Sequence, residues 1–165
     1  MLNILSESVV QLPNAKYKKY GGLTKVQRRL LDAAERATAT AYAPYSNFHV
    51  GAALLASDNE IITASNVENS AYGSTLCAER SALVRANAMG YRSFKAIAII
   101  AKGGKQGTRN PTAPCGACRQ MLYEATQLSG SDMEVIFSNT KKDRIVVSDI
   151  ETLLPFGFGP NDLAP

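Results

Sequence analysis

Cysteine and histidine are scarce in this sequence. Its 165 residues include three cysteines and a single histidine, His49. An odd number of cysteines is a poor basis for the disulfide frameworks that stabilise small secreted domains. Three thiols do suit a metal site in a reducing compartment, so we expect a cytoplasmic protein.

Long apolar runs and targeting signals are also missing. No run approaches the roughly 20 apolar residues that a transmembrane helix needs, so we expect no membrane span. No basic region precedes an apolar one in the first residues, and Glu7 comes early, which argues against a secretory signal.

Charge of one sign is not concentrated anywhere. The net charge is +4, and lysines and arginines are scattered apart from residues 16–19 and 141–142. Nucleic-acid-binding surfaces usually gather basic and aromatic residues, so we interpret these charges as solvated faces and expect no nucleic-acid partner.

The chain is long enough for one domain. Its 165 residues, 45% hydrophobic and 19% charged, suit a single globular domain with a substantial core. Residues 1–22 have no clear period and contain the turn pairs Pro13-Asn14 and Gly21-Gly22. We therefore interpret residues 1–22 as an N-terminal extension and residues 23–165 as the folded domain.

Hydrophobic periodicity and turn residues predict the element order αββαβαββα. A first helix opens with a capping box at Thr24 and runs to about Tyr42, and a short last helix opens with a capping box at Ser148 and ends at Pro155. The other predicted helices span 76–89 and 115–126, and the predicted strands span 48–56, 61–67, 96–101, 133–138 and 144–147. This order implies an α/β fold with a five-strand sheet between helical layers.

All three cysteines lie at two predicted helix starts, in the segments LCAERSA from residue 76 and PCGACR from residue 114. Cys115 and Cys118 are three residues apart, so the first turn of a helix directs both sulfurs to one side. Together with Cys77 they offer three soft ligands, which suit one zinc ion. Glu79 is rotated by about 200° from Cys77 on a helix, so it cannot easily share the direction of Cys77 toward the metal. A carboxylate beside the metal but outside its ligand set is where a proton carrier belongs.

Two other interpretations of the cysteines remain. A redox dithiol accounts for the Cys-x-x-Cys pair but leaves Cys77 and Glu79 without a role. A closed structural zinc site needs a fourth ligand, and His49 is the only histidine available. Strand alternation places His49 on the face opposite to Phe48, and a structural site needs no proton carrier.

Arg80 completes the first segment. Three thiolates carry more negative charge than one zinc ion neutralises, and helix-start amides offset part of the excess. We hypothesise that Arg80 offsets more of it by hydrogen bonding to ligand sulfurs, and so tunes the metal rather than binding substrate. The alternative is an ordinary arginine on an exposed helix face.

The two cysteine segments resemble the zinc signature of the cytidine deaminase superfamily. Cysteine rather than histidine at the first ligand is similar to the small, homotetrameric cytidine deaminases. The similarity covers about Leu23 to Leu163 and includes residues 41–48, 50–53, 66–69 and 153–155. It implies a three-layer αβα cytidine deaminase-like fold with a five-strand mixed sheet, and a homotetramer.

The resemblance also implies the reaction. Cys77, Cys115 and Cys118 would hold one zinc ion per subunit, and a water activated by it would attack C4 of cytosine. Glu79 would protonate N3 and then the departing amino group. Cytidine and 2′-deoxycytidine would become uridine and 2′-deoxyuridine, a step of pyrimidine salvage.

Substrate contacts follow from the same resemblance. Phe48 matches the aromatic residue of the pocket, Asn66 and Glu68 match a pair that binds the sugar hydroxyls, and the backbone of Ala78 reads the pyrimidine edge. Tyr72 and Phe158 match positions that reach a neighbouring subunit's pocket, so we expect oligomerisation to be part of catalysis. The extension and the glycine-rich insertion at 102–110 depart from the family pattern.

Three rival functions fit parts of the same pattern. A deaminase of modified nucleosides or aminopyrimidine antibiotics keeps the chemistry, but Asn66 and Glu68 favour an ordinary ribose. A deaminase of RNA or single-stranded DNA needs an electropositive, aromatic-lined groove, for which the sequence gives no evident candidate. A non-enzymatic zinc module does not need Glu79.

Overall fold

The computed structural model describes residues 14–104 and 106–163, which build a mixed sheet with helices on both faces. The strands are β1 (Lys16–Lys18), β2 (Phe48–Ala56), β3 (Ile61–Ser65), β4 (Phe94–Gly103), β5 (Glu134–Ser138) and β6 (Ile145–Asp149). The helices are α1 (Lys25–Ala37), α2 (Ala78–Ala88), α3 (Gly116–Ser129), α4 (Ile150–Leu153) and α5 (Pro160–Leu163), and the 3-10 turns are η1 (Tyr20–Gly22), η2 (Thr38–Thr40) and η3 (Tyr72–Ser74).

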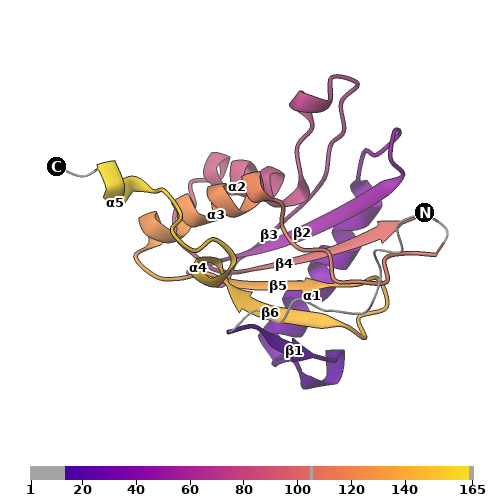
Figure 1. Cartoon of the computed structure of the whole chain (residues 1–165), viewed down its shortest axis with the longest axis horizontal. Helices are drawn as coiled ribbons and strands as arrows, with labels where there is room; N and C mark the ends of the chain where they lie inside the picture. Colours follow the sequence, from indigo (N-terminus) through magenta and orange to yellow (C-terminus); the bar gives the residue numbers. More distant parts are fainter. Residues whose placement is uncertain (1–13, 105, 164–165) are drawn as a thin grey trace, which may run out of the picture.

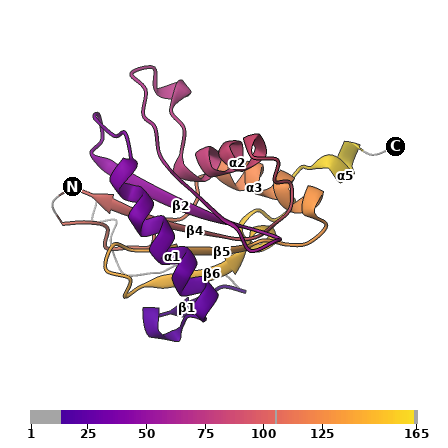
Figure 2. The same ribbon diagram turned by 180° about the vertical axis from the view of Figure 1, so that it is seen from behind.

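The sheet has the strand order β1-β6-β5-β4-β2-β3. Among the neighbouring strands of the described residues, β4 and β5 alone pair in parallel, because α3 carries the chain back across the sheet between them. Helix α1 covers one face, and α2 and α3 lie side by side on the other (Figures 1 and 2). The predicted three layers and mixed sheet are therefore confirmed. No helix in the described part of the chain has the length and apolar content needed to cross a bilayer.

The predicted number of strands is wrong, because the sheet has six strands rather than five. The additional strand β1 pairs antiparallel with β6, from Lys16 opposite Val147 to Lys18 opposite Ile145. Three residues are too few to reveal a period, and short, lysine-bearing strands are typical of sheet edges. The described end of the extension thus belongs to the sheet, residues 1–13 lie outside the description, and the boundary at residue 23 stays a prediction.

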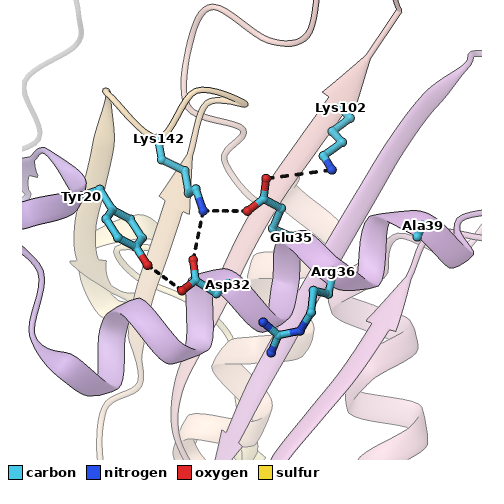
Figure 3. Close-up of a pocket in the computed structure, with 7 residues that line it drawn as sticks. All are labelled: Tyr20, Asp32, Glu35, Arg36, Ala39, Lys102 and Lys142. Atoms are coloured by element: carbon cyan, nitrogen blue, oxygen red, sulfur yellow. Dashed lines mark hydrogen bonds and ion pairs between the residues drawn. The ribbon is translucent and has the colours of Figure 1, made fainter.

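A cluster of polar side chains fastens this end of the extension to α1 (Figure 3). The Tyr20 hydroxyl donates to Asp32 at 2.5 Å, and Lys142 donates to Asp32 at 3.0 Å and to Glu35 at 2.6 Å. Burial opposes the charge on Asp32, but these hydrogen bonds outweigh it and hold the pKa of Asp32 below its usual value. Because its members satisfy one another, we interpret the cluster as an anchor for the extension.

Helix α1 begins as predicted and ends early. The Thr24 hydroxyl accepts from the Gln27 amide, and the Gln27 side chain accepts from the Thr24 amide, which confirms the capping box. The helix stops at Ala37 rather than near Tyr42 and continues as a 3-10 turn. In that turn the Thr38 and Thr40 hydroxyls donate to the carbonyls of the last helical turn, a local bonding mode that weakens α-helix.

Several other boundaries differ from the prediction. β3 ends at Ser65, β4 continues to Gly103, and α3 continues to Ser129. The cap of α4 is Asp149 rather than Ser148, since the Asp149 carboxylate accepts from the Thr152 amide at 2.7 Å. The short helix α5 was not predicted.

The core has two parts, one on each face of the sheet. Along β4, Ile97 and Ile99 pack under α2 and α3, while Ala98 and Ile100 pack under α1. This alternation is the two-residue period of a strand that is buried on both faces. Where α1 crosses β2, the backbones come so close that position 51 has no room for a side chain.

We expect Gly51→Ala to destabilise the fold by at least about 3 kcal/mol. A Cβ atom at Gly51 would lie 1.9 Å from the Ala34 carbonyl oxygen and 2.8 Å from the Thr38 amide nitrogen, so α1 would have to move. Equilibrium denaturation measures the change in the free energy of unfolding. Gly21→Ala is the matched control, because a Cβ atom there meets nothing within 4 Å. Equal stability of the two variants would contradict the close crossing.

Candidate functional site

The three cysteines come together where α2 and α3 begin. Cys77 and Cys115 are the N-cap residues of α2 and α3, and Cys118 lies in the first turn of α3. The Sγ atoms of Cys77 and Cys115 are 3.9 Å apart, those of Cys115 and Cys118 are 3.4 Å apart, and all three lie within 4.8 Å of one another. The structure therefore builds one sulfur cluster from two segments that are distant in the sequence.

The cluster fits a zinc ion. Zinc–sulfur bonds of about 2.3 Å in tetrahedral geometry place ligand sulfurs roughly 3.8 Å apart, close to the separations of 3.9 and 3.4 Å in the cluster. Among the described residues, these three cysteines are the group of His, Cys, Asp or Glu side chains whose ligand atoms lie close enough together to hold a metal ion. The His49 Nε2 atom lies 3.2 Å from the Asn47 side-chain oxygen instead, so the structure gives no support to a closed site with His49 as the fourth ligand.

The electrostatics of the cluster favour thiolate at Cys77. Hydrogen bonding with Cys118, followed by hydrogen bonding with Arg80, lowers the pKa of Cys77 to about 5. The pKa of Cys118 is raised, because its thiol shares a hydrogen bond with Cys77 and because it is buried. The exposed amides of two helix starts add positive potential at the same place.

Glu79 is a carboxyl group with almost no access to solvent. It lies in the first turn of α2 and is only 4% exposed. Burial, with a further contribution from the charge on Cys77, raises the pKa of Glu79 to about 7. A carboxyl group in this environment can bind or release a proton near neutral pH.

Arg80 contacts the cluster as hypothesised. Its Nη2 atom lies 3.7 Å from the Cys77 sulfur and donates to the Thr75 carbonyl at 2.8 Å. The buried Nε atom of Arg80 has no partner in the described structure, so the guanidinium group keeps a donor for charge on the sulfurs. These contacts favour a supporting role over the alternative of an exposed surface arginine.

We expect Arg80→Ala to weaken zinc retention or turnover by about 10- to 100-fold, the usual effect of losing a partner of a metal ligand. Zinc content after dialysis against a graded chelator measures retention, and steady-state kinetics measures turnover. Arg85→Ala is the control on the same helix, because Arg85 donates to the Thr63 carbonyl, away from the sulfurs. Unchanged turnover and zinc content in Arg80→Ala would exclude the tuning role.

The segment that contains Asn66 and Glu68 lies next to the cluster. Val67 forms a bridge with Leu76, which directly precedes Cys77. The Asn66 side chain binds the start of β2, and the Glu68 side chain binds the loop that precedes it. Asn66 donates to the Phe48 carbonyl at 2.9 Å, and Glu68 accepts from the Tyr45 and Ser46 amides at 2.9 and 3.2 Å. Sequence reasoning missed these two structural roles, since they depend on contacts between distant residues.

The other predicted substrate residues divide into buried and exposed positions. Ala78 is fully buried directly after Cys77, and Phe48 is partly buried at the start of β2. Tyr72 is 74% exposed in η3 and packs edge-on against Tyr45, with the ring centroids 6.1 Å apart. Phe158 is 59% exposed. Within one chain, the last two are therefore free to contact another molecule.

Comparison with known proteins identifies the family. A profile described as the cytidine and deoxycytidylate deaminase zinc-binding region matches residues 24–129, more than half of the chain. The chain belongs to the cytidine and deoxycytidylate deaminase family. Cytidine deaminase from Sporosarcina psychrophila is 44% identical over 136 residues, which cover 82% of this chain and 93% of that protein. Cytidine deaminase from Halalkalibacterium halodurans is 42% identical over 139 residues, or 83% and 97% of the two chains.

Solved structures of cytidine deaminases have the same fold. The crystal structure of cytidine deaminase from Burkholderia pseudomallei superposes with a TM-score of 0.71 at 43% identity, covering 82% of this chain and all of that one. The structure from Mycobacterium leprae gives a TM-score of 0.62 at 37% identity, covering 77% and 95%. These comparisons confirm the predicted family and, with it, the zinc-dependent hydrolytic chemistry.

Proposed function

We propose that this protein deaminates cytidine and 2′-deoxycytidine to uridine and 2′-deoxyuridine, a hydrolytic step of pyrimidine salvage. The observation that carries the proposal is the cluster of three sulfurs beside a buried carboxyl group, Glu79, at two helix starts. The 44% identity to a cytidine deaminase supports the choice of nucleoside.

The chemistry divides between the metal site and Glu79. Cys77, Cys115 and Cys118 would hold zinc, which when bound lowers the pKa of a water molecule toward neutrality. Glu79 accepts a proton from the attacking water and delivers it to N3 of the base. It then takes up the remaining proton of the hydroxyl group now on C4 and passes it to the amino group, so that the carbon–nitrogen bond breaks, ammonia leaves and the C4 carbonyl of uridine forms. Burial of Glu79 keeps bulk water away from these transfers.

Substrate binding would use the residues around β2. We propose that the backbone of Ala78 binds the pyrimidine edge and that Phe48 forms one face of the pocket. Asn66 and Glu68 would bind the sugar hydroxyls. A carboxylate has about four lone-pair sites, and Glu68 spends three on hydrogen bonds from Tyr45 and Ser46. Capacity for a hydroxyl donor therefore remains, and a single 3′-hydroxyl would serve ribose and deoxyribose alike.

We further propose a homotetramer with shared active sites, located in the cytoplasm. The exposed Tyr72 and Phe158 support shared sites, because aromatic residues are enriched at interfaces relative to the rest of the surface. A site built from thiolates requires reduced cysteines, which supports a reducing compartment.

Zinc quantification combined with an ultraviolet assay of cytidine conversion tests the proposal. We expect one zinc ion per subunit, loss of absorbance as cytidine becomes uridine, and stoichiometric ammonia. Chelator-treated protein is the control and should recover activity when zinc is restored. Negligible turnover of cytidine and deoxycytidine, with efficient turnover of a modified aminopyrimidine, would contradict the proposal.

A further inference from the structure

The ring of Phe48 lies directly against Gly103. In the antiparallel pair of β2 and β4, Phe48 is the partner of Gly103. A Cβ atom at Gly103 would lie 2.8 Å from Cδ2 and 3.0 Å from Cε2 of the Phe48 ring. Contacts that short do not occur between a Cβ atom and a ring, so the present ring position requires glycine at 103.

Hydrogen bonds fix the chain around Gly103. The Gly107 amide donates to the Gly103 carbonyl at 2.9 Å. The Thr108 amide donates to the Thr140 hydroxyl at 2.7 Å, and the Thr140 amide donates to the Thr108 hydroxyl at 3.0 Å. The Thr140 hydroxyl itself donates to the Ala101 carbonyl at 2.7 Å. The Thr108–Thr140 pair holds the later part of the glycine-rich insertion against the β5–β6 turn, and the bond to Ala101 holds the residue that precedes the insertion.

Two side chains, those of Asn66 and Ser46, hold the backbone of Phe48 by hydrogen bonds. Its carbonyl accepts from the Asn66 side chain at 2.9 Å, and its amide donates to the Ser46 hydroxyl at 3.0 Å. Ser46 in turn donates to Glu68. The three residues assigned to the nucleoside are therefore connected through the backbone of Phe48 and the side chain of Ser46, and the Phe48 ring packs against Gly103.

We propose that Gly103, held by the Thr108–Thr140 pair, is a positioning residue that sets where the Phe48 ring meets the nucleoside. The inference rests on the proposed function, since it concerns how the same pocket binds cytidine. It gives a role to the insertion at 102–110, which distinguishes this chain from the pattern of the family.

The test is Gly103→Ala, studied with cytidine. We expect KM to rise about tenfold, because the ring must move by a substantial fraction of an ångström, while kcat stays within about twofold, because Glu79 and the sulfurs are untouched. Zinc content should not change. Gly21→Ala is the matched control and should leave KM and kcat unchanged. A fall in kcat with KM constant would overturn the proposal.

A double-mutant cycle with Phe48→Leu asks whether Gly103 acts through the ring. If it does, adding Gly103→Ala to Phe48→Leu raises KM much less than it does in the wild-type chain. Fully additive effects would overturn the proposal. Thr140→Val, which removes the hydroxyl at nearly constant volume, should raise KM by about threefold, so a test remains if Gly103→Ala fails to fold.

A binding-independent measurement separates this inference from the proposed function. In protein labelled with ¹³C-phenylalanine, the Phe48 ring signals, assigned with Phe48→Leu, should shift in Gly103→Ala and stay fixed in Gly21→Ala. Shifted signals in an enzyme that ignores cytidine would refute the proposed function alone. Unshifted signals in an active cytidine deaminase would refute the role of Gly103 alone.

Discussion

Glu79→Gln is expected to keep one zinc ion per subunit and to lose cytidine turnover by at least about a hundredfold. A positioned proton carrier commonly contributes between a hundredfold and ten-thousandfold to rate, and glutamine matches glutamate in shape but cannot exchange a proton. The side chain is 4% exposed, so solvent has little access to take its place. Because the three sulfurs are unchanged, metal binding should not suffer.

Two measurements on one preparation check this expectation. Zinc content is measured by elemental analysis, and ammonia release is measured by a coupled assay at saturating cytidine. Glu124→Gln is the control, because it makes the same chemical change at an exposed residue of α3. Unimpaired ammonia release by Glu79→Gln would remove the proton carrier from the mechanism. Loss of zinc together with activity would instead place the carboxyl group among the ligands.

The sulfur cluster could be predicted from the sequence because its pieces are local. The step of three residues from Cys115 to Cys118 fixes both sulfurs on one side of a helical turn, and helix starts can be recognised over a few residues. What the local pattern does not contain is the meeting of the two helix starts. That meeting follows from the strand order: α2 connects β3 to β4 and α3 connects β4 to β5, both as crossovers between parallel strands in the same direction along the sheet, so both helices lie on one face (Figure 1).

The features that escaped prediction depend on register between distant strands. β1 is three residues long, and its place is fixed by pairing with Val147 rather than by any period of its own. The contact between Phe48 and Gly103 likewise exists only because β4 continues two residues beyond Ala101 to pair with the start of β2. Strand register is decided by the whole sheet, so no window around Gly103 could reveal it.

Phe158→Ala is expected to retain zinc and to lose cytidine turnover by at least about a hundredfold, if each site needs this side chain from a neighbouring subunit. The main chain of Phe158 is fixed to its own subunit, because its carbonyl accepts from the Gln120 side chain at 2.7 Å, while the ring is 59% exposed. This arrangement presents the ring outward. Leu128→Ala, which truncates a 61% exposed apolar side chain on α3, is the control and should remain active.

Mixed assemblies give the decisive form of this experiment. Co-expressed Phe158→Ala and Glu79→Gln chains are each inactive alone, yet a site can combine Glu79 of one chain with Phe158 of another. With random mixing, about a quarter of the sites contain both intact residues, so roughly that share of wild-type activity should return.

The matched negative control pairs Glu79→Gln with Cys115→Ser. Both residues act within one subunit, so no mixed assembly restores a site and activity should stay absent. Recovery with the Phe158→Ala chain but not with the Cys115→Ser chain can arise only if the sites are shared. Absence of recovery in assemblies shown by two affinity tags to be mixed would contradict shared sites, and so would full activity in a dilute monomer. In either case each subunit would have to complete its own pocket, and the outward-facing Phe158 would need another explanation.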